Sequence, residues 1–111
     1  MKALSIRQPW AELIILGIKT TEFRSRPTKV RGRIYIYASL GRSDPDDEAD
    51  CEREHGIDVD ALPRGVIVGT VELHDCKGEE WRFRLPERAS ELRKPDNHPM
   101  PVWFTPFRSG E

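Results

Sequence analysis

The sequence of 111 residues has few cysteines and no long apolar run. Cys51 and Cys76 form no CxxC pair, and two cysteines do not make the disulfide framework of a small secreted protein. No stretch reaches the roughly 18 apolar residues that a membrane helix needs. Arg7 and Gln8 interrupt the N-terminal segment too early for a signal peptide. We therefore expect a soluble, cytoplasmic protein that does not associate with a membrane.

The motifs of several enzyme and cofactor sites are also missing. There is no Walker loop, no GxSxG, no HExxH and no glycine-rich dinucleotide fingerprint. His74 and Cys76 have the spacing of half a zinc site, but no second half follows. We expect neither a metal nor a cofactor. The chain is too short for a dinucleotide-binding fold or an eight-fold β/α barrel, so we predict one domain over residues 1–111 with its core at 3–107.

The net charge of −1 hides two blocks of opposite sign. Residues 1–42 carry nine Lys or Arg against two acids, whereas residues 43–62 carry nine acids against one arginine. The remaining residues, 63–111, are balanced. This asymmetry favours an anionic partner for the first block and a solvated acidic helix, away from that partner, for the second. A protein-interaction module that uses the acidic helix is the third-ranked alternative.

The apolar pattern predicts five or six short strands and two or three short helices. Strands are expected at 3–6, 18–24, 33–38, 66–73, 81–85 and within 102–107, and helices at 9–16, 43–56 and 87–92. Gly69, inside the most apolar strand, indicates a bulge or a close backbone approach. This pattern favours an α+β, mainly β fold: a small, partly closed mixed β-barrel with short flanking helices.

Candidate binding residues lie in the first, basic block. Trp10 can stack on a base, and Arg7 and Gln8 can reach phosphates or base edges. The loop that follows has no acid and attracts phosphates through counterion release; its cations are Arg24, Arg26, Lys29, Arg31 and Arg33. Two alternatives remain open, because Trp10 can equally belong to the core and the loop can equally be a solvated face.

A second constellation follows the first predicted helix. A lysine held near a carboxylate, as Lys19 is near Glu22 in sequence, can act as a positioned cation or as a base; surface salt bridges on a barrel rim are the alternative. In a regular strand these two side chains face opposite ways, so a shared pocket needs a turn or bulge near Lys19. A hydrolase would use Lys19 with Glu22 or Glu72 as acid and base, and Thr20 or Thr21 as nucleophile.

Four motifs in order make the sequence resemble the ASCH (activating signal cointegrator homology) domain family. They read SIRQPWA at 5–11, GIKxxExR at 17–24, RGR at 31–33 with the strand that runs to Ser39, and LPxGVIVGxVxL at 62–73. The resemblance implies a β-barrel related to the PUA domain, with a cleft between the barrel and the first helix. By matching motif, that cleft would be lined by Gln8, Pro9, Trp10, Lys19, Glu22 and Arg24, with Ser39 at the end of its strand.

The resemblance also implies the class of ligand. RNA or single-stranded nucleic acid, or a modified nucleoside, is the expected partner. Some relatives are N4-acetylcytidine amidohydrolases that use a lysine, a threonine three residues on and a distant glutamate. Here Lys19 matches, Glu22 stands where that threonine would be, and Glu72 is a loose match to the distant glutamate. Other relatives are ribonucleases in which a cleft lysine assists cleavage. We rank binding first and hydrolysis second.

Overall fold

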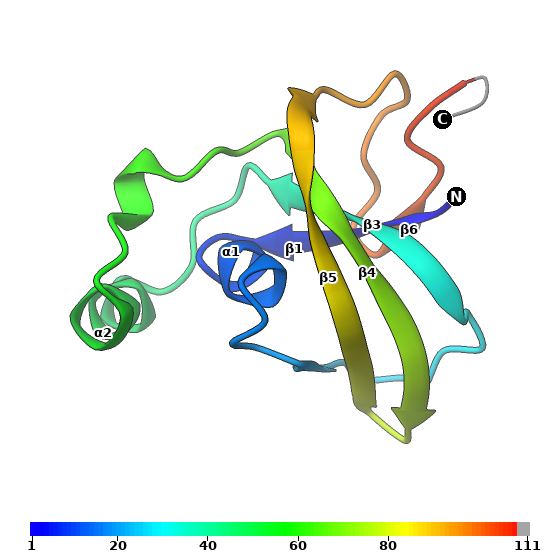
Figure 1. The fold of residues 1–111 in the computed structure, drawn as a ribbon, viewed down its shortest axis with the longest axis horizontal. Coiled ribbons are helices and arrows are strands. Elements are labelled where there is room, and N and C mark those ends of the chain that lie inside the picture. Colours follow the sequence, from blue (N-terminus) through cyan, green and yellow to red (C-terminus); the bar gives the residue numbers. More distant parts are fainter. Residues whose placement is uncertain (109–111) are drawn as a thin grey trace.

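The chain forms a curled sheet of six strands with two α-helices beside it (Figure 1). The computed structural model describes residues 1–108. The elements in chain order are β1 (Ala3–Arg7), α1 (Trp10–Ile15), β2 (Thr21–Phe23), β3 (Gly32–Ser39), α2 (Pro45–His55), a 3₁₀ turn η1 (Val59–Ala61), β4 (Val66–Lys77), β5 (Glu80–Arg93) and β6 (Trp103–Phe104).

The strand order is β2-β5-β4-β3-β1-β6. Only β1 and β3 run parallel; the other neighbouring pairs are antiparallel. The long hairpin of β4 and β5 crosses the molecule diagonally in Figure 1, with α1 against it. This mainly β, α+β arrangement confirms the predicted small PUA-like barrel, in which the sheet curls without complete hydrogen-bonded closure.

Side chains, rather than a strand ladder, bring the two ends of the curled sheet together. The indole of Trp81, in β5, stacks on that of Trp103, in β6, with ring centroids 5.6 Å apart. The guanidinium of Arg24, just after β2, lies 5.8 Å from the Trp81 ring. The same group donates a hydrogen bond of 3.0 Å to the backbone oxygen of Ser5 in β1. A seam between β1 and β2 therefore runs along one side of the barrel.

Helix α1 is short, and burial holds it in place. The helix spans six residues, four of them buried, and packs on β4 and β5. Six residues form no stable helix in isolation, so the contacts with the sheet supply the stability. The helix was expected over 9–16; it starts one residue later because Pro9, which follows a cis peptide bond, is its N-cap. Gly17 then adopts a φ of +79°, which favours glycine.

Helix α2 matches its prediction from the Ser43-Asp44-Pro45 start to Gly56. The Asp44 side chain accepts a hydrogen bond from the Asp46 N–H, and Gly56 ends the helix in the left-handed conformation at φ 66°. Only Glu48 and Cys51 of this helix are buried. The acidic block is therefore a surface helix, as expected.

Gly69 leaves no room for a side chain between β4 and β5. A Cβ atom added there would lie 2.3 Å from the backbone oxygen of Glu87 and 2.7 Å from Cδ1 of Ile15. Register shifts flank the glycine in both of its ladders. The predicted close backbone approach and the predicted irregularity are both confirmed.

Three element predictions need correction. Residues 87–92 were expected to be helical, but they continue β5, because Glu87 and Arg88 pair with β4. The closing strand expected within 102–107 is only the two residues of β6, bounded by Pro101 and Pro106. The strand expected over 18–24 is only β2, because the backbone N–H groups of Ile18 and Lys19 both donate to the Leu13 oxygen and form a turn.

Candidate nucleic-acid interface

A cleft of about 710 Å³ opens at the seam between β1 and β2. Its volume is in the range of pockets that hold one small ligand. Four parts of the chain meet there: the end of β1 with the start of α1, the residues around β2, the end of β3 with the turn after it, and a segment before β6. The cleft is lined by Ser5, Ile6, Arg7, Trp10, Glu22, Arg24, Tyr37, Ser39, Leu40, Gly41, His98, Pro99, Met100 and Pro101.

An ion pair between Glu22 and Arg24 forms one side of the cleft. Arg24 donates from Nε and Nη2 to Oε2 of Glu22, at 3.2 and 2.9 Å. Its Nη2 also donates to the Ser5 oxygen across the seam. Both side chains are mostly buried, with exposed fractions of 24% for Arg24 and 16% for Glu22. The Arg24 guanidinium is therefore held by protein acceptors, and its charge is matched inside the cleft.

Lys19 joins this pair through a turn, the condition that the sequence set for a pocket shared by Lys19 and Glu22. The turn before β2 brings Lys19 Nζ to 3.5 Å from the other carboxylate oxygen, Oε1 of Glu22. The same ammonium lies 5.9 Å from the ring centroid of Trp10, within cation–π distance. Lys19 thus contacts two residues of the cleft lining, the Glu22 carboxylate and the Trp10 indole, without being a lining residue itself.

Trp10 has two exposed sides. It is half-buried, packs in part against the core, and lines the cleft. It also lines a smaller hollow of about 220 Å³, whose polar wall comes from α2 through Asp47, Asp50 and Glu54. No residue of the acidic helix α2 lines the cleft, but Trp10 borders both the cleft and α2. At this point a single side chain, that of Trp10, separates the acidic helix from the cleft.

Gln8 and Pro9 lie in the interior and not in the cleft lining. Gln8 is fully buried; its side chain donates to the Pro63 oxygen at 3.0 Å and accepts from the Glu12 N–H at 2.9 Å. Ser43 Oγ donates to the Gln8 backbone oxygen at 2.7 Å. These bonds fix the turn that carries Arg7 and Trp10 into the cleft. Gln8 and Pro9 therefore position the cleft residues and do not line the cleft themselves.

The basic loop after β2 is exposed and lies outside the cleft lining. Arg26, Lys29 and Arg31 are all exposed, and Arg31 donates to the backbone oxygens of Thr28 and Val30. Arg33 points elsewhere: it donates to the Leu85 oxygen and pairs with Glu87 at 3.8 Å. The loop therefore offers three exposed cations, and Arg33 is engaged with β5.

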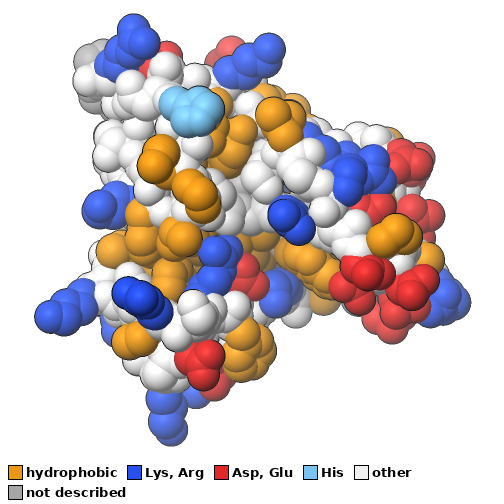
Figure 2. All heavy atoms as spheres, turned by 180° about the vertical axis from the view of Figure 1, so that it is seen from behind, with side chains coloured by type: hydrophobic (Ala, Val, Ile, Leu, Met, Phe, Trp, Pro, Cys, Tyr) orange, Lys and Arg blue, Asp and Glu red, His pale blue; other side chains and the backbone are white. Residues whose placement is uncertain are grey.

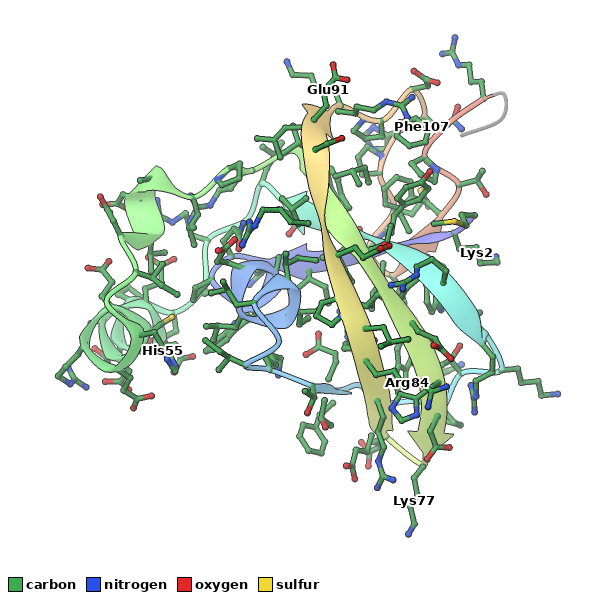
Figure 3. All side chains as sticks on the ribbon, in the orientation of Figure 1. Lys2, His55, Lys77, Arg84, Glu91 and Phe107 are labelled. Carbon is green, nitrogen blue, oxygen red and sulfur yellow. The ribbon has the colours of Figure 1, made fainter. Side chains whose placement is uncertain are left out.

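The structure does not bring Glu72 to the cleft lining. Glu72 accepts a hydrogen bond of 2.8 Å from Arg84, which lowers the pKa of the carboxyl, and Arg84 lies on the outer side of β5 (Figure 3). Thr20 is exposed, and Thr21 is half-buried in β2 opposite Arg82. Of the five predicted catalytic side chains, only Lys19 and Glu22 come together.

Sequence reasoning missed one wall of the cleft. It is made by residues 98–101, which no helix or strand pattern marks, and which Ser5 holds by donating from Oγ to the Met100 oxygen at 2.7 Å. Tyr37 and Leu40 were also missed. The prolines of the 95–101 segment were the available signal, since they exclude regular structure and leave an extended wall.

The acidic block gathers at one end of the surface, where Arg42 of the basic block pairs with Glu48 and Asp60. In Figure 2, hydrophobic side chains gather near the middle of the face with Lys and Arg side chains among them, while acidic side chains crowd the end of the molecule that carries α2. Within residues 1–108, no helix has the length and apolar character to cross a bilayer. The same residues contain no group of three or more His, Cys, Asp or Glu side chains that could hold a metal ion.

Comparisons with known proteins agree with these motifs. The family model for the ASCH domain matches residues 4–97. The chain is 33% identical over 100 residues to human activating signal cointegrator 1, and 34% identical over 96 residues to the mouse protein. These matches cover 83% and 79% of the chain, but only 17% and 16% of the relatives, so the chain spans about a sixth of their length. Because the family match extends over most of its residues, the chain belongs to the ASCH domain family.

Proposed function

We propose that the cleft binds single-stranded RNA or a related single-stranded nucleic acid, with one base stacked on Trp10. The observation that carries this proposal is the Trp10 indole, half-exposed in a cleft of nucleotide size from which an exposed cationic loop continues directly after Arg24. Base stacking on an aromatic side chain needs an unpaired base, which a single strand supplies and a duplex hides. The family, which is generally linked to RNA binding, supports the same ligand class.

The distribution of charge supports the same ligand. Among residues 1–108, Arg7, Arg26 and Lys29 have no carboxylate within ion-pair distance, so their charges remain available to phosphates. Arg7 lines the cleft, whereas the other two belong to the loop. The acids of α2 would repel a strand that extended past Trp10 on their side. A bound strand is therefore expected to run from the cleft toward the loop.

Salt dependence tests this proposal. For a fluorescent RNA octamer titrated by anisotropy, the affinity should fall between about 50 and about 200 mM salt, with a slope of log K against log salt near −2. That slope corresponds to about three phosphate contacts at roughly −0.7 each. The double variant Arg26→Ala with Lys29→Ala should bind more weakly and with a slope smaller by about 1.4.

Arg84→Ala is the matched control, since it removes an arginine that is paired with Glu72 outside the cleft. It should leave both affinity and slope unchanged. Absence of binding at low salt, or binding that salt does not weaken, would contradict the proposal.

Hydrolysis is a second candidate function, and one observation favours it. The turn before β2 brings Lys19 to 3.5 Å from Glu22 at the border of the cleft, with exposed fractions of 24% and 16%. Such a pair can move a proton to or from a bound nucleotide. If it does, Lys19→Ala should lower turnover of RNA or of N4-acetylcytidine by about 100-fold or more, the usual share of a general acid or base. Equal product formation by both proteins, followed by chromatography, would remove Lys19 from any mechanism.

A further inference from the structure

The Glu22 carboxylate is an unusual group to find in a cleft for a polyanion. It lines the cleft, and a carboxylate repels phosphate oxygens. Within the same cleft, the charge of Arg24 is already matched by Glu22. Lys19, at 3.5 Å, gives the cluster a net charge of +1, but the Glu22 carboxylate itself offers a phosphate no hydrogen-bond donor. It is suited instead to an uncharged part of the ligand that carries hydrogen-bond donors.

The two carboxylate oxygens of Glu22 differ in the acceptor capacity that they have left. Oε2 receives both Arg24 hydrogen bonds, which occupy its two lone pairs. Among residues 1–108, the ion-pair partner of Oε1 is the Lys19 ammonium, at 3.5 Å, which is at the long end for a hydrogen bond. Arg24 fixes the orientation of the carboxylate, so Oε1 is a positioned acceptor with free capacity.

This acceptor and the Trp10 indole have the Lys19 ammonium as a common neighbour. Lys19 Nζ is 3.5 Å from Oε1 and 5.9 Å from the Trp10 ring centroid, and both Glu22 and Trp10 line the cleft. A base that lies against the indole can turn one edge toward the carboxylate. Base edges carry the chemical identity of a nucleotide, whereas the stacked face is common to all four bases.

We infer that Glu22 reads the base, and that the cleft prefers guanine and rejects uracil. This inference rests on the proposed single-strand binding. The Watson–Crick edge of guanine presents two adjacent N–H donors, from N1 and N2, to the acceptor. Adenine and cytosine present one amino donor beside an acceptor nitrogen. Their expected affinities therefore lie between those of guanine and uracil. Uracil presents two carbonyl oxygens around a single N–H, and those oxygens face the carboxylate unfavourably.

Binding of RNA hexamers with a single variable base tests this inference. The hexamers are uridine tracts whose third base is G, A, C or U, so that all share the same phosphates. For the wild-type protein, anisotropy should show about tenfold tighter binding of the G hexamer than of the U hexamer, the usual discrimination of one well-made base contact. Glu22→Gln, which replaces one carboxylate oxygen by a donor, should reduce that ratio to less than about threefold.

A control variant and modified bases separate the outcomes. Glu72→Gln removes a carboxylate that pairs with Arg84 outside the cleft, and it should keep the full ratio. In the wild-type protein, inosine (without the N2 amino group) and 1-methylguanine (without the N1–H) should each bind several-fold more weakly than guanine. These two measurements do not depend on the folding of any variant.

Each result decides between the proposals. Equal binding of the four hexamers, or a preference for guanine that survives Glu22→Gln, would overturn the reading by Glu22 while leaving single-strand binding in place. No binding of any hexamer at low salt would overturn the proposed function itself.

Discussion

Replacing Gly69 by alanine is expected to lower the free energy of unfolding by about 3 kcal/mol, at the upper end for an overpacked interior site. The added methyl group would lie 2.3 Å from the Glu87 backbone oxygen and 2.7 Å from Cδ1 of Ile15. The Ile15 side chain can turn away, but the oxygen belongs to the neighbouring strand. Relief therefore requires β5 to move away from β4, which disturbs the longest ladder of the sheet. Urea unfolding followed by circular dichroism measures the effect as a lower midpoint.

Thr70→Ala is the matched control for this experiment. Thr70 is the next residue of β4, half-buried and opposite Glu87, so the change removes side-chain atoms without creating an overlap. Thr70→Ala should lower the free energy of unfolding by less than about 1 kcal/mol, which is in the range of strand propensities. If the two variants unfolded at the same urea concentration, the overlap between the added methyl group at position 69 and β5 would not be a source of instability.

Replacing Trp10 by alanine is expected to weaken RNA binding by about 5- to 150-fold, because stacking on one aromatic ring contributes about 1–3 kcal/mol. Trp10 is the only tryptophan that lines the cleft among residues 1–108. Its loss also leaves the Lys19 ammonium without the ring that lies 5.9 Å away. Anisotropy with a labelled RNA octamer at low salt measures the change directly.

Two further variants separate lost stacking from damage to α1. Trp10→Phe keeps an aromatic face and should retain most of the affinity. Leu13→Ala removes a buried side chain of the same helix that lies outside the cleft lining, so it should lower stability with little effect on binding. A weakening by Leu13→Ala equal to that of Trp10→Ala would show that helix packing, and not the indole, carries the affinity.

Local rules predicted those elements whose signals lie within the element itself. Helix α2 follows from an Asp-Pro start and a Gly56 end, and strand β3 from its β-branched and aromatic residues. The helix expected at 87–92 failed because Glu, Arg, Ala and Leu favour a helix intrinsically. Pairing with β4 decided the outcome, and pairing depends on residues nearly twenty positions away.

The candidate site shows the same difference between features set by nearby residues and features set by distant ones. The turn between α1 and β2 joins Lys19 to Glu22, and the sequence already showed that such a turn was needed. The wall at 98–101 could not be predicted, since it is held by a hydrogen bond from Ser5 to Met100, 95 residues apart. Gln8 belongs to a motif that was expected to line the cleft, yet its side chain is buried. A motif shows that a site requires a residue, but it does not show whether that residue contacts the ligand or supports the residues that do.

The stacked pair of Trp81 and Trp103 has a consequence for the width of the cleft. Two flat rings and one guanidinium join the ends of the sheet there, and no backbone ladder does. Moving β1 away from β2 would break no strand pair, but it would part the buried Trp81 from Trp103 and break the hydrogen bond from Arg24 to the Ser5 oxygen. The width of the cleft is therefore set by close packing of side chains rather than by backbone hydrogen bonds.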